Sequence, residues 1–258
     1  MRPTVTLTTD FGTRDPFAGA MKGVVLSRCP DAAIVDLSHD VSPHDVLEAA
    51  LFVAAAVPYF PPGTVHVVVV DPGVGTARRP LAARCGDQFV VGPDNGFATL
   101  LWESHPPSEV REITSFEPPA GQVSATFHGR DVFAPVAAAL ASGADLSQLG
   151  PVLVEPVRLS IPRPRFEEGR WLGEVIHIDR FGNAMTNLRQ AELGGQPYLV
   201  QAAGAELGSI RRTYGDAAPG EALALFGSAG YLEIAVNQGR ADEAPGLQVG
   251  DPVEARPV

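Results

Sequence analysis

The chain has 258 residues, of which 45% are hydrophobic and 19% are charged, which is typical of a folded globular protein and excludes a disordered one. Its formal net charge of -11 at pH 7 would repel nucleic acid and anionic membranes, so we expect neither as a partner.

Cysteine usage and the first residues indicate a cellular compartment. The two cysteines, Cys29 and Cys85, form no CxxC or metal-ligand pattern and are expected to be reduced core residues, as in the cytosol. The opening stretch, MRPTVTLTTDFG, lacks the charged head and apolar run of a signal peptide. The longest apolar run, residues 49–57, is too short to span a bilayer. We therefore predict a cytoplasmic protein without a membrane partner.

Strand and helix patterns alternate through the first half of the chain. Alternating or continuous β-branched residues predict strands over 4–12, 32–40 and 64–73, and a hairpin over 80–96. Helical spacing predicts helices over 17–29, 42–60, 97–104 and 129–143. This alternation predicts an α/β domain with a mostly parallel sheet.

The pattern changes near residue 150. Residues 149–170 are rich in proline and have no helical period. Short strand patterns then recur within 171–179, 198–204, 222–236 and 250–257, separated by turn signals. The second half is therefore expected to be a smaller all-β domain, either a barrel or a sandwich. We place the α/β domain at 1–157, a linker at 158–168 and the all-β domain at 169–258.

Polar residues gather where the predicted strands of the α/β domain end. In open α/β sheets, ligands bind beyond the carboxyl ends of the strands, so these residues are expected to share one edge. The four clusters are Asp10 and Asp15; Asp36, His39 and Asp40; Asp71, Arg78 and Arg79; and Thr126, His128, Arg130 and Asp131.

Each cluster also has a simpler interpretation. Asp10 and Asp40 could cap turns, and Asp131 could stabilise the dipole of a following helix. His39 and His44 with Asp40 could suggest metal ligands, but no second metal motif recurs, so no metal site is predicted. The DPGVGT stretch could cradle phosphate, but it lacks the spacing and the lysine of a P-loop.

Asp71, Arg78 and His128 are harder to explain in structural terms alone. A carboxylate, a guanidinium and an imidazole together can bind one water molecule and orient it. The permanent charge of arginine favours hydroxide-like character, and either His or Asp can accept the proton. No serine or cysteine lies in a GxSxG-like elbow, so direct attack by water is the simpler chemistry.

Seven blocks of the sequence resemble the S-adenosyl-L-methionine (SAM) hydrolases, also called SAM hydroxide adenosyltransferases, which are related to the fluorinases and chlorinases. The blocks span about residues 5–255 and follow the family order: TTDFGTRDPFAGAMKG, LSHDVSPHD, VVDPGVGTARRPL, GPDNG, TFHGRDVFAP, HIDRFGNAMTN and GSAGYLEIAVNQG.

The resemblance implies a reaction and a catalytic set. Water or hydroxide attacks C5′ of the ribose opposite the sulfonium, which releases adenosine and L-methionine without a cofactor, because SAM itself is the substrate. The resemblance implies that Asp71, Arg78 and His128 hold and activate the attacking water. Arg78 matches the family spacing from the acid, and Arg79 is the alternative.

The resemblance also implies the substrate contacts. Asp10 would accept both ribose hydroxyls, and Asp15 would lie near the methionine ammonium. Asp179 and Asn183 would hold the methionine and ribose ends. Phe127 and Phe181 would wall the adenosine, and the set is completed by Phe11, Thr126, Ser228, Tyr231, Glu233, Val236 and Asn237. In the relatives the site lies between subunits of a homotrimer, which we expect here as well.

Some positions depart from the halogenating relatives. Those enzymes have a tyrosine at Asp71, a serine at Gly129 and a tryptophan at His44, and an acid beside a halide is repulsive. These departures disfavour a halide-dependent SAM transferase. A non-catalytic adenosine- or SAM-binding protein, which would not need the three catalytic residues, and a metal-dependent phosphoesterase remain as alternatives.

Overall fold

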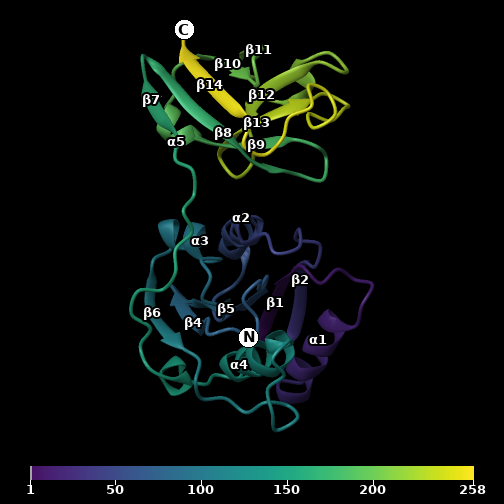
Figure 1. Cartoon of the computed structure of the whole chain (residues 1–258), viewed down its shortest axis with the longest axis vertical. Helices are drawn as coiled ribbons and strands as arrows, with labels where there is room; N and C mark the ends of the chain where they lie inside the picture. Colours follow the sequence, from purple (N-terminus) through teal and green to yellow (C-terminus); the bar gives the residue numbers. More distant parts are fainter. Residues whose placement is uncertain (1) are drawn as a thin grey trace. The chain divides into compact units, whose positions relative to one another are not determined.

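The computed structural model describes residues 2–258. The chain divides into two compact units, Met1–Ser160 and Ile161–Val258, drawn in purple to teal and in green to yellow in Figure 1. The division falls within the segment 158–168 that the sequence analysis assigned to a linker.

The first unit is built around one six-stranded sheet with the strand order β2-β1-β3-β5-β4-β6. Strands β2, β1, β3 and β5 run parallel to one another, and β4 runs antiparallel to both β5 and β6. The expected α/β fold with a mostly parallel sheet is confirmed. The strands are β1 (Thr4–Thr9), β2 (Ala33–Ser38), β3 (Val65–Val69), β4 (Pro80–Cys85), β5 (Gln88–Pro93) and β6 (Pro107–Glu112).

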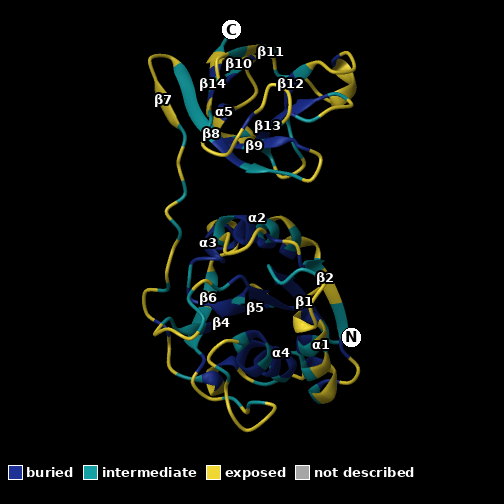
Figure 2. Cartoon of the chain, turned by 45° about the vertical axis from the view of Figure 1, so that its right-hand side comes forward, coloured by how far each residue is buried: buried dark blue, intermediate teal, exposed yellow. Residues whose placement is uncertain are grey.

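Helices cover both faces of this sheet (Figure 1). One face carries α1 (Phe17–Arg28) and α4 (Ala134–Ala141), and the other carries α2 (Val46–Ala56) and α3 (Thr99–Ser104). Short helical turns are η1 (Val57–Tyr59), η2 (Gly129–Phe133) and η3 (Leu146–Leu149). Strand β3 is buried along its whole length because its valines alternate between the two cores. The neighbouring strand β5 is also mostly buried and is drawn in dark blue in Figure 2.

In the first unit, strand β6 and the start of the helix after His128 differ from the sequence expectation. Strand β6 was not predicted, because its sequence PSEVRE is polar and begins with proline, which suits a strand at the edge of the sheet; it pairs with β4 on one side and is bridged on the other only between Arg111 and Val152 among the described residues. The helix expected over 129–143 begins as the π-helical turn η2 and continues as the shorter α4. This turn directly follows His128.

The second unit is an all-β domain around one antiparallel sheet, with the order β11-β10-β14-β8-β9-β13-β12 and β7 paired to β8. A bridge between Arg211 and Leu225 links the segment after β11 to β12, so the sheet nearly closes into a barrel. The expected all-β domain is confirmed, in the barrel form. Its elements are β7 (Arg165–Glu167), β8 (Arg170–Ile178), β9 (Ala184–Arg189), α5 (Gln190–Leu193), β10 (Tyr198–Ala202), β11 (Ala205–Ser209), η4 (Tyr214–Asp216), β12 (Ala222–Phe226), β13 (Tyr231–Val236) and β14 (Pro252–Pro257).

None of the helices in residues 2–258 combines the length and the apolar character that a membrane span requires.

Candidate active site

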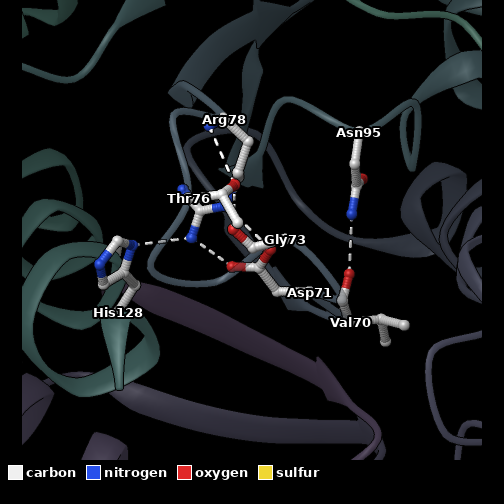
Figure 3. Close-up of polar contacts among 7 residues, drawn as sticks. All are labelled: Val70, Asp71, Gly73, Thr76, Arg78, Asn95 and His128. Carbon is white, nitrogen blue, oxygen red and sulfur yellow. Dashed lines mark hydrogen bonds and ion pairs between the residues drawn. The ribbon is translucent and has the colours of Figure 1, made fainter. Parts of the chain in front are cut away.

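The first unit brings together Asp71, Arg78 and His128, which lie far apart in the sequence (Figure 3). Arg78 donates from Nε to Oδ1 of Asp71 over 2.8 Å and from Nη2 to Oδ2. The same Nη2 lies 2.7 Å from Nδ1 of His128. The Asp71 and Arg78 side chains are only 5% and 10% exposed, so this charge pair is largely shielded from water.

The loop after β3 is shaped to hold these side chains. Thr76 donates from Oγ1 to the Gly73 carbonyl over 2.7 Å, which closes the turn between Asp71 and Arg78. Gly75 has a φ of +76°, and a Cβ there would lie 2.5 Å from the Ala125 carbonyl oxygen. Glycine is therefore required at position 75, where the loop approaches the segment that leads to His128.

A neighbouring turn after β5 anchors the start of the same loop. Asn95 donates from its side-chain amide to the carbonyl of Val70 over 2.8 Å, immediately before Asp71 (Figure 3). This bond satisfies a carbonyl at the end of β3 and holds the backbone from which Asp71 projects.

Arg79 has a different partner from Arg78. It donates from Nε and Nη2 to Oδ2 of Asp94 over 2.9 and 2.6 Å, and from Nη2 to the Glu155 carbonyl over 3.1 Å. Asp94 is buried and also accepts from the backbone N–H of Val157. The geometry therefore brings Arg78, and not the alternative Arg79, to Asp71 and His128.

The surroundings of His128 favour its neutral form. Burial lowers the pKa of His128, and the positive charge of Arg78 lowers it further. A guanidinium can only donate hydrogen bonds, so Nδ1 of His128 must accept from Arg78, and the proton of the neutral ring lies on Nε2. Nη1 of Arg78 is buried and has no hydrogen-bond partner among the described residues.

A cavity of about 300 Å³ lies beside these residues in the first unit. Three aromatic rings, Phe11, Phe17 and Phe127, form one of its walls, with ring centroids 5.3–5.9 Å apart in tilted and edge-on arrangements. The complete lining is Asp10, Phe11, Phe17, Pro43, His44, Val69, Asp71, Val74, Thr126, Phe127, His128 and Gly129.

Asp10 presents a carboxylate to the same cavity. It follows β1, and its Oδ2 accepts from the backbone N–H of His44 over 3.0 Å. The His44 ring is mostly exposed, and its Nδ1 lies 3.9 Å from the same oxygen. Among the described residues, none donates a hydrogen bond to the second oxygen, Oδ1, so it can accept one from a ligand hydroxyl.

The other predicted residues of the first unit divide in two. Thr126 and Phe127 line the cavity with Phe11, whereas Asp15 is exposed and is not part of the lining. Asp131, two residues beyond the cavity-lining Gly129, is buried. The hydrogen bond from Arg130 lowers its pKa, and its carboxylate accepts from the Ser124 N–H over 2.9 Å. This pair holds the segment that leads to His128.

The remaining predicted residues belong to the second unit. Asp179 and Asn183 contact each other, because the Asn183 side-chain amide donates to Oδ2 of Asp179 over 3.1 Å and its N–H donates to Oδ1 over 2.9 Å. Phe181, between them, is 76% exposed. Tyr231, Glu233 and Val236 lie on β13, whereas Ser228 lies in the turn before it and Asn237 directly after it.

Glu233 has a partner that sequence reasoning missed. Tyr214 donates from its hydroxyl to Oε1 of Glu233 over 2.7 Å. Burial raises the pKa of Glu233, and the nearby charge of Asp179 raises it further. Burial, with the bond to Glu233, raises the pKa of Tyr214 to about 12. Arg189, also missed, donates to the Tyr231 hydroxyl over 2.9 Å.

Six lining residues of the cavity were not predicted. A signal could have indicated Phe17, because it is an aromatic residue at the start of a helix and remains 43% exposed. His44 and Gly129 had a signal as well, because they are positions where the halogenating relatives carry other residues. The remaining three contribute through backbone position or apolar contact, which a sequence pattern does not reveal: Pro43, Val69 and Val74.

Two sets of residues bear on metal and redox chemistry. Across residues 2–258, no three His, Cys, Asp or Glu side chains are grouped so that they could hold a metal ion. Cys29 and Cys85 are free and buried. Burial raises the pKa of Cys85 to about 11, and the Trp102 indole N–H donates to its sulfur over 3.2 Å.

Comparison with known proteins identifies the family. Residues 5–150 match the SAM hydroxide adenosyltransferase N-terminal domain, and residues 173–254 match the C-terminal domain. A curated (R)-S-adenosyl-L-methionine hydrolase of Thermus thermophilus is 45% identical over 98% of this chain and 99% of its own length. A fluorinase of Actinoplanes sp. is more distant, at 31% identity over 91% of each chain. A crystal structure of an uncharacterised conserved protein from Thermotoga maritima matches with a TM-score of 0.90 and 36% identity over 98% of this chain and 99% of that one. The chain therefore belongs to the SAM hydroxide adenosyltransferase family.

Proposed function

We propose that this protein hydrolyses SAM to adenosine and L-methionine by attack of water or hydroxide on C5′ of the ribose. The observation that carries the proposal is the contact of Arg78 with both Asp71 and His128 beside a cavity walled by three phenyl rings. The relatives with the same domains over nearly the whole chain are named as SAM hydrolases.

The reaction is a displacement that balances without a cofactor. The water oxygen forms a bond to C5′, the bond from C5′ to sulfur breaks, and its electron pair stays on sulfur as the thioether of methionine. One proton leaves the water. A sulfonium is a good leaving group, so the protein's main contribution is to hold a desolvated nucleophile in line with the breaking bond.

The three side chains divide this task. Arg78 supplies a permanent positive charge that stabilises a hydroxide-like oxygen. His128, with its ring proton on Nε2, acts as a donor that orients the water. Each carboxylate oxygen of Asp71 can accept more than the one bond that Arg78 makes, so Asp71 is the proton acceptor of this proposal.

Asp10 and the phenyl wall would bind the nucleoside. A carboxylate suits two adjacent ribose hydroxyls, and the free Oδ1 of Asp10 supports this role. Thr126 and the rings of Phe11 and Phe127 would contact the adenosine, and Asp15 the methionine ammonium. The contacts proposed for the second unit are Asp179, Phe181, Asn183, Ser228, Tyr231, Glu233, Val236 and Asn237.

We further propose that the protein is a cytoplasmic homotrimer in which a neighbouring subunit completes each site, without nucleic acid or membrane as partner. Its active form should then sediment as a trimer, and diluting it to monomers should abolish turnover. Turnover by a monomer would contradict this assembly.

The name of the SAM hydrolase relatives suggests a stereochemical preference. In (R)-S-adenosyl-L-methionine, the L descriptor already defines the α-carbon, so (R) describes the sulfonium sulfur. We propose the same preference here, and separate incubations with the two sulfur epimers would test it. Equal turnover of both would reject it.

Product analysis tests the reaction itself. Incubation with SAM in ¹⁸O-labelled water should yield adenosine labelled at its 5′ oxygen, together with unlabelled methionine. Binding of SAM without adenosine formation would indicate a binding protein, and a requirement for added halide would indicate a transferase. Turnover that chelator abolishes would indicate a metal-dependent reaction.

A further inference from the structure

A chain of polar contacts runs from the surface of α1 to the turn that carries Asp10. The Lys22 ammonium lies 2.6 Å from Oδ2 of Asp36, and Oδ1 of Asp36 lies 3.0 Å from Nε2 of His39. The latter is a close electrostatic contact whose alignment departs from that of a hydrogen bond. On the other side of the ring, Nδ1 of His39 lies 2.8 Å from Oγ1 of Thr9.

The same elements are joined by their backbones. Oγ1 of Thr9 accepts from the N–H of Phe11 over 3.3 Å, across the residue that projects the Asp10 carboxylate. The His39 carbonyl accepts from the N–H of Gly12 over 2.7 Å, and Val41 donates to the Thr9 carbonyl over 3.3 Å. The turn at 9–12 is thus held to the segment directly after β2 by these two backbone bonds and by the contact of Thr9 with His39.

The combination of threonine, histidine and aspartate resembles the side chains of a nucleophilic hydrolase, but its burial excludes that use. The Thr9 residue is 0% exposed and His39 is 6% exposed, so no substrate carbon can reach the hydroxyl. The Thr9 hydroxyl also accepts a hydrogen bond from the backbone N–H of Phe11, two residues later. Both features indicate a group that holds the main chain.

Donors and acceptors can be assigned along the whole chain of contacts from Phe11 to Lys22. Phe11 donates to Thr9, the Thr9 hydroxyl donates to Nδ1, and the Nε2 proton faces the Asp36 carboxylate, which the Lys22 ammonium neutralises. Burial opposes ionisation of Asp36, but the hydrogen bond from the Lys22 ammonium and the contact with His39 lower the pKa of Asp36 below its usual value. Lys22 is the only lysine of the chain.

We propose that Lys22, Asp36 and His39 are positioning residues, which act through Thr9 to hold Asp10 and Phe11 in the geometry that binds the nucleoside. This inference rests on the proposed function, because Asp10 and Phe11 line the cavity assigned to SAM. It gives a role to the strand-end residues Asp36 and His39, which the catalytic mechanism does not use.

Adenosine binding to the full-length protein, measured by calorimetry, tests the proposal. Lys22→Met and His39→Leu should weaken adenosine binding by about tenfold, because each breaks one hydrogen-bonded or charged link. Lys22→Arg should restore it to within about twofold, because it keeps the cation. We call the contacts from Lys22 through Asp36 and His39 to Thr9 the relay. Arg28→Met is the matched control, because it removes a cation from the same helix but outside the relay, and the adenosine affinity of this variant should stay unchanged.

Two further measurements separate positioning from stability. In Lys22→Met, the turnover number for SAM should change less than the KM. In an Asp10→Asn background, His39→Leu should cost less adenosine affinity than it does in the wild type, because the relay acts through Asp10. Unchanged adenosine affinity with only a lower melting temperature would overturn the proposal, as would full additivity with Asp10→Asn.

Amide hydrogen exchange keeps the test independent of the reaction. Lys22→Met should raise exchange at the Phe11 and Gly12 amides while exchange in β3 and β5 stays unchanged. If the wild-type protein makes no adenosine from SAM, the proposed function fails, and the exchange result still decides whether the relay holds this turn. Equal exchange in the variant and the wild type would refute the relay.

Discussion

At the scale of single residues, Asp71 is the most demanding position, because it both accepts from Arg78 and is proposed to accept the proton of water. Asp71→Asn keeps the shape but loses the charge. We expect the turnover number to fall by roughly 10²–10⁴-fold, the range for removal of a general base, while the KM for SAM changes little. Steady-state kinetics checks this. The matched control is Asp31→Asn, which removes an exposed acid far from the site, and equal losses in both variants would contradict the assignment.

Gly75 is a second residue whose requirement can be measured. Gly75→Ala places a Cβ 2.5 Å from the Ala125 carbonyl in a backbone conformation that L-residues disfavour. We expect a loss of about 1–3 kcal/mol in the free energy of unfolding and a displaced Arg78. Urea unfolding and turnover together check it. Gly86→Ala is the matched control for backbone strain, because it has a similar positive φ but no neighbouring atom within 4 Å, and an equal loss of turnover there would contradict the steric account.

At the scale of elements, the paired strands β1 and β3 bury a histidine. Nδ1 of His66 lies 2.8 Å from the Thr6 hydroxyl, and burial lowers the pKa of His66 from 6.5 to about 4. The folded protein therefore holds this ring neutral. Between pH 6.5 and 4 the unfolded chain binds a proton that the folded chain does not, so this contribution to stability is lost as the pH falls through that range.

The loss should reach about 3 kcal/mol near pH 4, from a shift of this size at about 1.4 kcal/mol per pKa unit. His66→Gln removes the titrating group and should flatten this part of the pH dependence. Urea unfolding of both proteins between pH 4 and 7 measures the difference. Parallel curves for the two proteins would show that His66 makes no such contribution.

At the scale of the whole molecule, Arg79 ties the loop after β3 to the segment that leads out of the first unit. Arg79→Met leaves the Asp94 carboxylate buried without its cation and frees the Glu155 carbonyl. We expect faster proteolytic cleavage near residues 154–160 and a lower turnover number through the adjacent Arg78. Cleavage mapped by mass spectrometry checks this. Arg163→Met, in the same proline-rich stretch, is the control, and equal cleavage rates in Arg79→Met and wild type would oppose this coupling.

Much of the fold was predictable because its signals are local. Strand β3 is a continuous apolar run, and α2 has helical spacing, so burial patterns alone define both. Strand β6 was not predicted because it lies at the edge of the sheet and carries polar residues, which hide the pattern of a strand. The π-helical turn after His128 was not predicted because no side-chain pattern distinguishes it from the start of an α-helix.

The amino-acid sequence by itself determined the two-part architecture and the family, because motif residues and hydrophobic periods are written in the order of the chain. It also named Asp71, Arg78 and His128 as one catalytic group. Only the tertiary structure decided which arginine contacts Asp71 and which nitrogen of His128 accepts from that arginine. It also decided that Asp36 contacts Lys22 and that His39 contacts Thr9. These choices depend on distances and angles between segments remote in the chain. A sequence states which groups are present, but the packing of strands and helices sets which of them come within hydrogen-bond reach.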